Sequence, residues 1–171
     1  MGALYLSFKA ASMLEIVIRD MRAGEEHKLW QLFHDTIHRV NTSDYGPEQI
    51  EAWSPADRDP TQWAERMQKV APFCAVMADE IVGFSDLQAD GLVDFMFVHH
   101  AYQGQGVANA LMAEIKRRAA KRGIAELYAH VSITAKPFFA RHGFRVVAEQ
   151  TVRMGEGEDE VVLQNYLMRT Q

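Results

Sequence analysis

The segment VHHAYQGQGVA, from Val98 to Ala108, joins a nearly continuous apolar run at 91–100 to a stretch of helical periodicity at 107–122. Gly104 and Gly106 allow backbone conformations that other residues resist, and they let a ligand approach the main chain closely. The first amides of a helix have no intrahelical acceptor and lie at the positive end of its dipole. The sequence therefore predicts an anion site at this turn, with a phosphate or pyrophosphate as its occupant.

Three phosphate-binding loops share this physics, and their spacings distinguish them. A Walker loop needs Gly-x-x-x-x-Gly-Lys-Ser/Thr, and the sequence contains no such run. A dinucleotide-binding loop needs a third glycine where this chain has Asn109, and it usually falls in the first strand–helix unit. The third pattern, Gln/Arg-x-x-Gly-x-Gly/Ala, matches QGQGVA at 103–108 throughout.

Hydrophobic periodicity predicts the remaining strands and helices. Strands are expected at 14–20, 73–78, 81–88, 91–100, 125–132, 144–154 and 160–169. Helices are expected at 25–40, 47–53, 61–70, 107–122 and 133–142. This order predicts an α/β layout around one mixed sheet.

Composition limits the classes of partner. The chain has 171 residues, of which 48% are hydrophobic and 24% charged, as in an ordinary globular domain. A formal net charge of −5 argues against nucleic acid as a partner. No apolar run approaches the ~20 residues that cross a bilayer, which argues against a membrane partner. The single cysteine, Cys74, suits a reducing compartment, so we expect a cytoplasmic protein.

Two further elements accompany the loop. The apolar pair Phe97-Val98 precedes it, and FFARHGF at 138–144 follows in a later strand–helix unit. In this order the elements resemble the GNAT superfamily of N-acetyltransferases, over nearly the whole chain from Met13. The resemblance implies the GNAT acyl-CoA N-acyltransferase fold, in the α/β (α+β) class. Its single mixed, mostly antiparallel sheet has splayed central strands and flanking helices. The implied reaction moves an acetyl group from acetyl-CoA to a primary amine by direct transfer in a ternary complex.

The first residues are treated separately. Met13 is a second methionine and stands just before the first expected strand. We expect 1–12 to be an N-terminal extension, from an upstream start or an added segment, and 13–171 to be the N-acetyltransferase domain. The alternative for 1–12 is an extra edge strand or a packed arm.

The resemblance also implies a set of cofactor contacts. Backbone amides of the loop would bind the CoA pyrophosphate, and the Gln103 side chain would add a hydrogen bond. Backbone groups of Phe97 and Val98, exposed where the strands splay, would pair with the pantetheine arm, and Ser132 would contact it. The expected cofactor-binding residues are Phe97, Val98, Gln103, Gly104, Gln105, Gly106, Val107, Ala108, Ser132 and Phe139.

The family's usual acid is absent. The resemblance implies that the backbone N–H of Val98 stabilises the oxyanion, but Phe139 occupies the position of the family's tyrosine. Either the thiolate leaves unassisted, or Tyr128 or a water supplies the proton. This departure keeps a second function open, an acyl-CoA-binding regulatory module with little or no turnover.

Two side chains are candidates for the base that deprotonates the amine. Period-two alternation places Asp94 on one strand face with Val98. It also places His130 on one face with Tyr128, across the expected split from Asp94, where an imidazole could accept a proton near neutral pH. The alternatives are a hydrogen-bonded structural carboxylate and a satisfied core histidine.

The acceptor site is expected where the first two helices cover the split. The candidate residues are Phe33, His34, Ile37, Tyr45 and Trp53. Apolar residues of this kind belong to the core more often than to a pocket, and only Tyr45, in a loop, favours a functional role. His34 and His38 have the helical spacing of zinc hydrolases, but Asp35 replaces the usual Glu and no third ligand stands out, so no metal is expected. A small-molecule amine is favoured over a protein acceptor, and a homodimer is possible.

Overall fold

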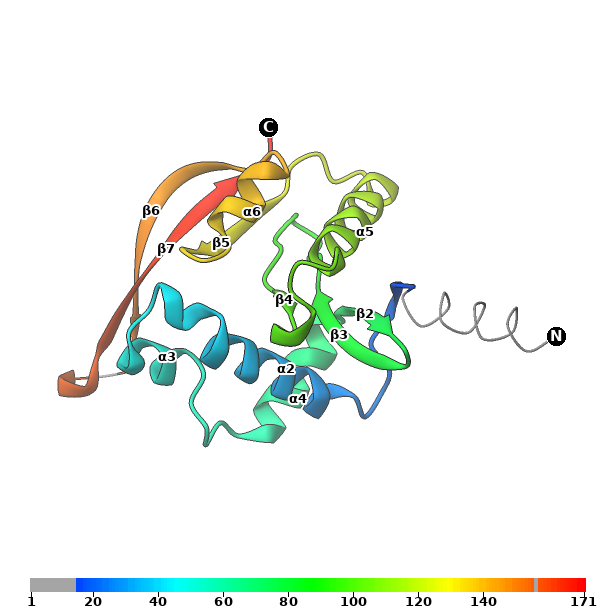
Figure 1. Ribbon diagram of the computed structural model, residues 1–171. Coiled ribbons are helices and arrows are strands. Elements are labelled where there is room, and N and C mark those ends of the chain that lie inside the picture. Colours follow the sequence, from blue (N-terminus) through cyan, green and yellow to red (C-terminus); the bar gives the residue numbers. More distant parts are fainter. Residues whose placement is uncertain (1–14, 156) are drawn as a thin grey trace.

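The computed structural model describes residues 15–155 and 157–171 (Figure 1). The expectation for 1–12 lies outside the described residues. The strands are β1 (Val17–Asp20), β2 (Phe73–Met77), β3 (Glu80–Ser85), β4 (Met96–Val98), β5 (Tyr128–Ser132), β6 (Arg145–Met154) and β7 (Val161–Arg169). The helices are α2 (Glu26–Arg39), α3 (Pro47–Trp53), α4 (Pro60–Val70), α5 (Val107–Arg122) and α6 (Lys136–Arg141). Short 3₁₀ turns are η1 (Asn41–Ser43), η2 (His100–Tyr102) and η3 (Gly157–Asp159).

The strands form two antiparallel sheets, in the orders β1-β2-β3-β4 and β5-β7-β6. A parallel bridge between Leu92 and Tyr128 joins them, with Val93 N donating to Tyr128 O at 2.8 Å. Only glycine fits at Gly91, because its φ is +93° and a Cβ there would lie 2.2 Å from Glu126 O. Beyond the bridge β4 and β5 separate, which confirms the predicted splayed sheet.

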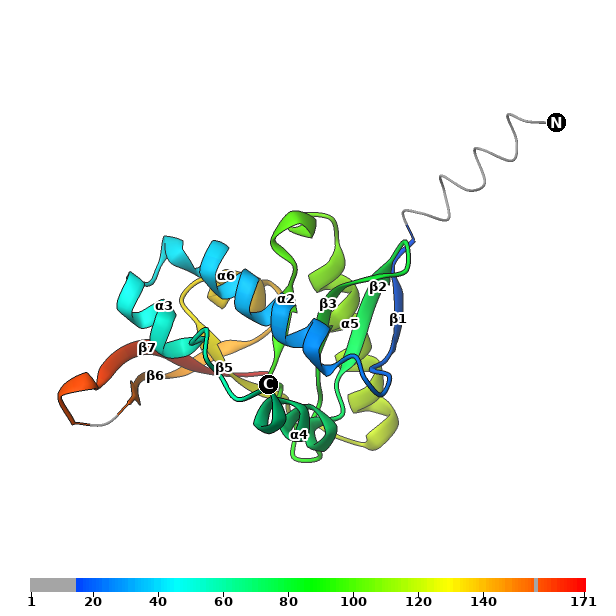
Figure 2. The same ribbon diagram turned by 90° about the horizontal axis from the view of Figure 1, so that it is seen from below.

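Helices cover both faces. Helix α5 packs on β2, β3 and β4 through an apolar cluster that includes Leu111 and Ile115. Helices α2 and α4 pack on the other face through a second cluster that includes Leu29 and Trp63. Figure 1 shows α5 and α6 on one side of the sheets and α2, α3 and α4 on the other. Figure 2 shows the long β6–β7 hairpin extending past α3, which lies beside β7 in both views. No helix among the described residues is long and apolar enough to span a bilayer.

The strand predicted at 91–100 is wrong in length, since β4 covers only Met96–Val98. The carboxylate of Asp86 accepts hydrogen bonds from the backbone N–H groups of Asp94 (3.0 Å) and Phe95 (2.7 Å). The Ser85 hydroxyl donates to Phe95 O at 2.6 Å. Side chains therefore satisfy the backbone just before β4, where a neighbouring strand would otherwise do so.

Burial of Asp86 makes the stability of the fold depend on pH. Asp86 has no exposed surface, and desolvation raises its pKa from 3.8 to about 6. A carboxyl whose pKa is raised on folding stabilises the fold fully below its unfolded pKa, and that contribution disappears as pH rises through about 6.

We therefore expect Asp86→Asn, which keeps an acceptor oxygen for the two amides, to flatten this dependence. Between pH 4 and 7 the difference in unfolding free energy between the natural chain and the variant should change by roughly 2–3 kcal/mol. Thermal melts across that range measure it, with the exposed Asp57→Asn as control. Parallel pH profiles for the natural chain and Asp86→Asn would contradict the prediction.

Candidate functional site

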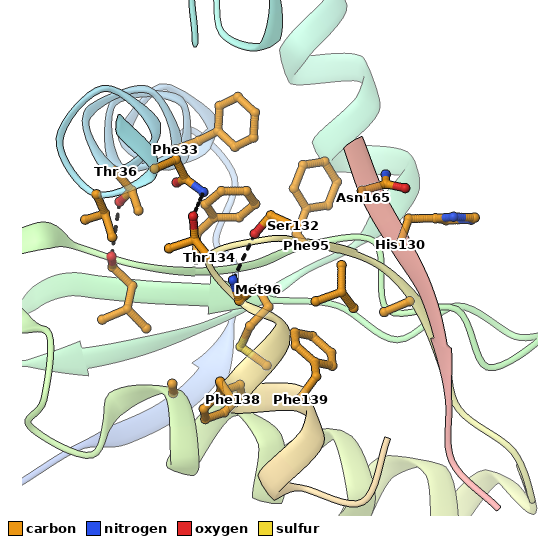
Figure 3. A pocket seen from close by; sticks show the side chains of 18 of the residues that line it. Phe33, Thr36, Phe95, Met96, His130, Ser132, Thr134, Phe138, Phe139 and Asn165 are labelled. Atoms are coloured by element: carbon orange, nitrogen blue, oxygen red, sulfur yellow. Dashed lines mark hydrogen bonds between the residues drawn. The ribbon is translucent and has the colours of Figure 1, made fainter. Parts of the chain in front are cut away.

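A cavity of about 650 Å³ opens where β4 and β5 diverge (Figure 3). Figure 3 places Phe33 and Thr36 of α2 at one end of the view, and Phe138 and Phe139 of α6 at the other. The cavity therefore reaches both helical layers through the split in the sheet. Its volume is typical of small-molecule sites.

The cavity brings together most of the residues predicted from the sequence. Its lining includes Phe33, Tyr45, Trp53, Asp94, Phe97, Val98, Gln103, Gly104, Gly106, Val107, Ala108, His130, Ser132 and Phe139. Four other predicted residues lie outside the lining: His34, Ile37, Gln105 and Tyr128.

These four residues have other contacts. Ile37 is fully buried in the core, and the Gln105 side chain donates to Ala101 O. The Tyr128 hydroxyl donates to the Asp90 carboxylate, which raises the pKa of Tyr128. The expected roles of these side chains in the cavity therefore have no support from their placement.

Hydrogen bonds from His34 and His38 link helices α2 and α3. His34 Nδ1 lies 2.9 Å from Ser54 Oγ, and His38 Nε2 donates to Ser54 O at 2.8 Å. These contacts join α2 to the end of α3, and burial together with His38 lowers the pKa of His34. Within residues 15–155 and 157–171, no group of three or more His, Cys, Asp or Glu side chains is arranged to hold a metal ion.

The glycine-rich turn leaves amides free for an anion. Gly104 and Gly106 have φ values of +71° and +86°, and α5 begins after Gly106 without a side-chain cap. Ala110 N donates to Gly106 O, so the amides of Val107 to Asn109 precede the first helical bond. These N–H groups border the cavity at the positive end of the helix dipole and can bind a phosphate.

The carbonyl of Val98 is held by two side chains. Gln103 Nε2 donates to it at 2.8 Å, and Thr36 Oγ1 donates at 3.1 Å. The Gln103 amide thus faces β4 rather than the loop, which corrects its expected contact with a pyrophosphate. Since both lone pairs of the carbonyl oxygen are used, the N–H of Val98 is the group left for a ligand.

Register decides which backbone groups face the split. The N–H of His99 donates to the C=O of Val82, which lies opposite it on β3. Along an antiparallel strand, the backbone N–H and C=O groups of successive residues point alternately toward one neighbouring strand and away from it. The N–H and C=O of Phe97 therefore point to Phe84 on β3, while those of Val98 point toward the split. The expected exposure of backbone groups holds for Val98 and fails for Phe97.

Asp94 and His130 both line the cavity, on the two chain segments that separate beyond the bridge. Each lies two positions past the bridge between Leu92 and Tyr128. The Asp94 carboxylate, 31% exposed, forms an ion pair with Arg66 of α4 at 2.8 Å. His130 Nδ1 lies 2.8 Å from Gln150 Oε1, an oxygen that only accepts, so Nδ1 carries the proton and Nε2 keeps its lone pair. Figure 3 shows His130 beside Asn165, away from Phe138.

Hydrogen bonds join the second sheet to the helical cover. The Tyr45 hydroxyl donates to Gln164 O at 2.7 Å and accepts from Ile133 N at 2.9 Å, and burial raises the pKa of Tyr45. Ser132 Oγ accepts from Ala135 N at 3.1 Å. Tyr45 and Ser132 both line the cavity, and each side chain also holds neighbouring backbone in place. Tyr45 was expected to contact the acceptor, and Ser132 was expected to contact the cofactor.

Phe139 supplies an apolar surface and no proton. It is 3% exposed, and its ring centroid lies 5.0 Å from that of Phe144 and 5.8 Å from that of Phe138. Phe139 therefore cannot serve as a proton donor in this cavity.

Sequence reasoning missed several residues of the site. Thr36 could have been found, because it is a polar residue on the apolar stripe of a helix, and this is a signal of a buried hydrogen bond. Arg58 and Arg66 also line the cavity. Their positions depend on packing of α4 against distant residues, which no local pattern reports.

Comparisons with known proteins agree on one family. The family model described as "Acetyltransferase (GNAT) domain" matches residues 41–156. The "Uncharacterized N-acetyltransferase YafP" of Escherichia coli (strain K12) is 34% identical over 140 residues, covering 82% of this chain and 88% of the relative.

Solved structures have the same fold. A GCN5-related N-acetyltransferase from Rhodopseudomonas palustris matches with a TM-score of 0.84 and 26% identity, over 91% of this chain and 94% of that one. The PaiA N-acetyltransferase of Thermoplasma acidophilum, in complex with coenzyme A, matches with a TM-score of 0.71 and 16% identity, over 92% and 99% of the two chains. At 16% identity, the second likeness concerns the fold alone.

Proposed function

This chain belongs to the GNAT family of acetyltransferases, and on that premise we propose that it moves an acetyl group from acetyl-CoA to a small-molecule primary amine within a ternary complex. The observation that carries the proposal is the uncapped start of α5, whose amides open into the same cavity as the N–H of Val98. The pyrophosphate binds at the helix start, and the pantetheine arm enters the split toward Val98. A protein with this fold was solved in complex with coenzyme A, which supports the binding of a CoA compound.

The acyl transfer needs a donor for the oxyanion, a base for the amine and a way for the thiolate to leave. The amine nitrogen attacks the thioester carbon, a C–N bond forms, and the N–H of Val98 stabilises the oxyanion. His130 Nε2 takes the proton from the amine. Collapse of the intermediate breaks the C–S bond, and the thiolate leaves unassisted or takes a proton from water, since Tyr128 is outside the cavity lining and Phe139 has no proton to give.

A second function is favoured by Phe139 alone. Without the hydroxyl expected at this position, the domain would bind acyl-CoA and turn it over slowly or not at all, as a regulatory module. Both functions use the same loop, so they differ only in turnover.

Thermal melts with acetyl-CoA, CoA and ATP in parallel test binding. A ligand at 100 times its Kd stabilises a protein by about 2.7 kcal/mol, a rise in Tm of a few degrees for a domain of this size. We expect this rise with both CoA compounds and not with ATP. Thiol release against an amine panel then separates the two functions, and a Tm that no CoA compound raises would overturn both.

A further inference from the structure

The cavity is electropositive although the whole chain is acidic. Three guanidinium groups line it, those of Arg58, Arg66 and Arg141, against one carboxylate, Asp94. Asp94 pairs with Arg66. The chain as a whole has a formal net charge of −5, so this local excess of positive charge belongs to the cavity.

Arg58 is held in place without a counter-ion. It lies between α3 and α4, and its guanidinium is 5.4 Å from the ring centroid of Trp30 and 5.9 Å from that of Trp63. Among the described residues, no carboxylate oxygen lies within 4 Å of it, and burial together with Arg66 lowers its pKa. A partly buried guanidinium stacked on aromatic rings is a strong site for a carboxylate, which it binds through two parallel hydrogen bonds.

Aromatic rings connect Arg58 to the reacting end of the cavity. Phe33, Phe95 and Phe97 line the cavity, and the Phe33 ring centroid lies 4.8 Å from that of Phe97, the residue before Val98. An acceptor that reaches from Arg58 to the N–H of Val98 would therefore cross apolar surface. Its middle should be apolar or aromatic.

Resting on the proposed acetyl transfer, we propose that the acceptor is a primary amine joined through an apolar or aromatic body to a carboxylate, which Arg58 binds on the α2–α4 side of the cavity. Arg66 adds positive charge beside it while remaining paired with Asp94. Arg58 is then a residue that determines specificity and takes no part in bond making.

Two matched pairs of amines test this inference. The first is 4-(aminomethyl)benzoate with benzylamine, and the second is 6-aminohexanoate with pentylamine; each pair differs only in the carboxylate. With saturating acetyl-CoA, kcat/KM for a carboxylate-bearing member should exceed that of its neutral partner by about tenfold or more, since hydrogen bonds to charged groups are the stronger ones. Arg58→Gln should remove this advantage, because kcat/KM should fall at least tenfold more for each carboxylate-bearing member than for its neutral partner. Acetylation of the neutral amines also shows that the variant is folded.

Arg145→Gln, on the exposed strand β6 and outside the cavity lining, is the control and should retain the advantage. Equal rates for both members of each pair in the natural chain, or an equal loss for both in Arg58→Gln, would overturn the inference while the proposed function stands.

Tryptophan fluorescence of the CoA-bound protein separates failure of the inference from failure of the proposed function. Carboxylate-bearing amines that bind through Arg58 without being acetylated would leave the inference standing and overturn the proposed reaction. An absence of both binding and turnover with all four compounds would overturn the inference.

Discussion

Gly106→Val should weaken acetyl-CoA binding by about 100-fold or more. Gly106 has a φ of +86°, a conformation in which a β-branched residue is a true outlier. The variant would relieve this strain by rotating the turn, and the amides before the first bond of α5 would then no longer converge on one anion. A hydrogen bond to a charged group contributes about 1.5–3 kcal/mol, so losing two of them accounts for the expected effect. Isothermal titration with acetyl-CoA measures it.

The chain offers a matched control at the other end of the same helix. Gly123 has a φ of +69°, and a Cβ there would meet nothing within 4 Å. Gly123→Val should therefore lower Tm to a similar extent while leaving the Kd of acetyl-CoA unchanged. Equal losses of affinity in both variants would show that the effect of Gly106→Val is one of general stability.

The loop was predictable because its determinants are local. Two glycines with positive φ and a helix start within residues 103–108 leave a pattern that spacing alone reveals. The splayed sheet was predicted only from the family resemblance that this pattern supports. The point where the two sheets meet depends on the close approach of Gly91 to Glu126 O, which hydrophobic periodicity does not indicate.

Other parts of the site depend on contacts between distant residues. Asp86 binds the backbone at Asp94, and the regular strand covers only Met96–Val98, which period-two alternation does not indicate. The pairing of Asp94 with Arg66 joins two residues 28 positions apart, and charge alone does not specify it. His34 was likewise predicted to line the pocket, but its side chain contacts Ser54, 20 positions along the chain, a partner that no local pattern indicates. Sequence reasoning thus located the glycine-rich side of the cavity more completely than the side formed by α2 and α4, where packing of the helices decides which side chains are exposed.

His130→Gln should lower kcat by about 100-fold and leave acetyl-CoA binding intact, the size expected when a general base is removed. The free lone pair on Nε2 supports this role, because Gln150 Oε1 holds the proton on Nδ1. Steady-state kinetics with a saturating amine measure kcat, and isothermal titration measures the Kd of acetyl-CoA.

Asp94→Asn is the matched comparison on the opposite wall of the split. Its carboxylate is already bound to Arg66, so taking up the amine proton would require that ion pair to break. We therefore expect a loss below about tenfold from this variant; a general base would account for a larger factor. The opposite ranking would assign the base to Asp94, and unchanged rates in both variants would remove both residues from the proton transfer. Asp94 and His130 each lie two residues beyond the bridge that joins the sheets, so their positions along the chain do not indicate which of them is the base. The hydrogen-bond partner of each side chain is what distinguishes them.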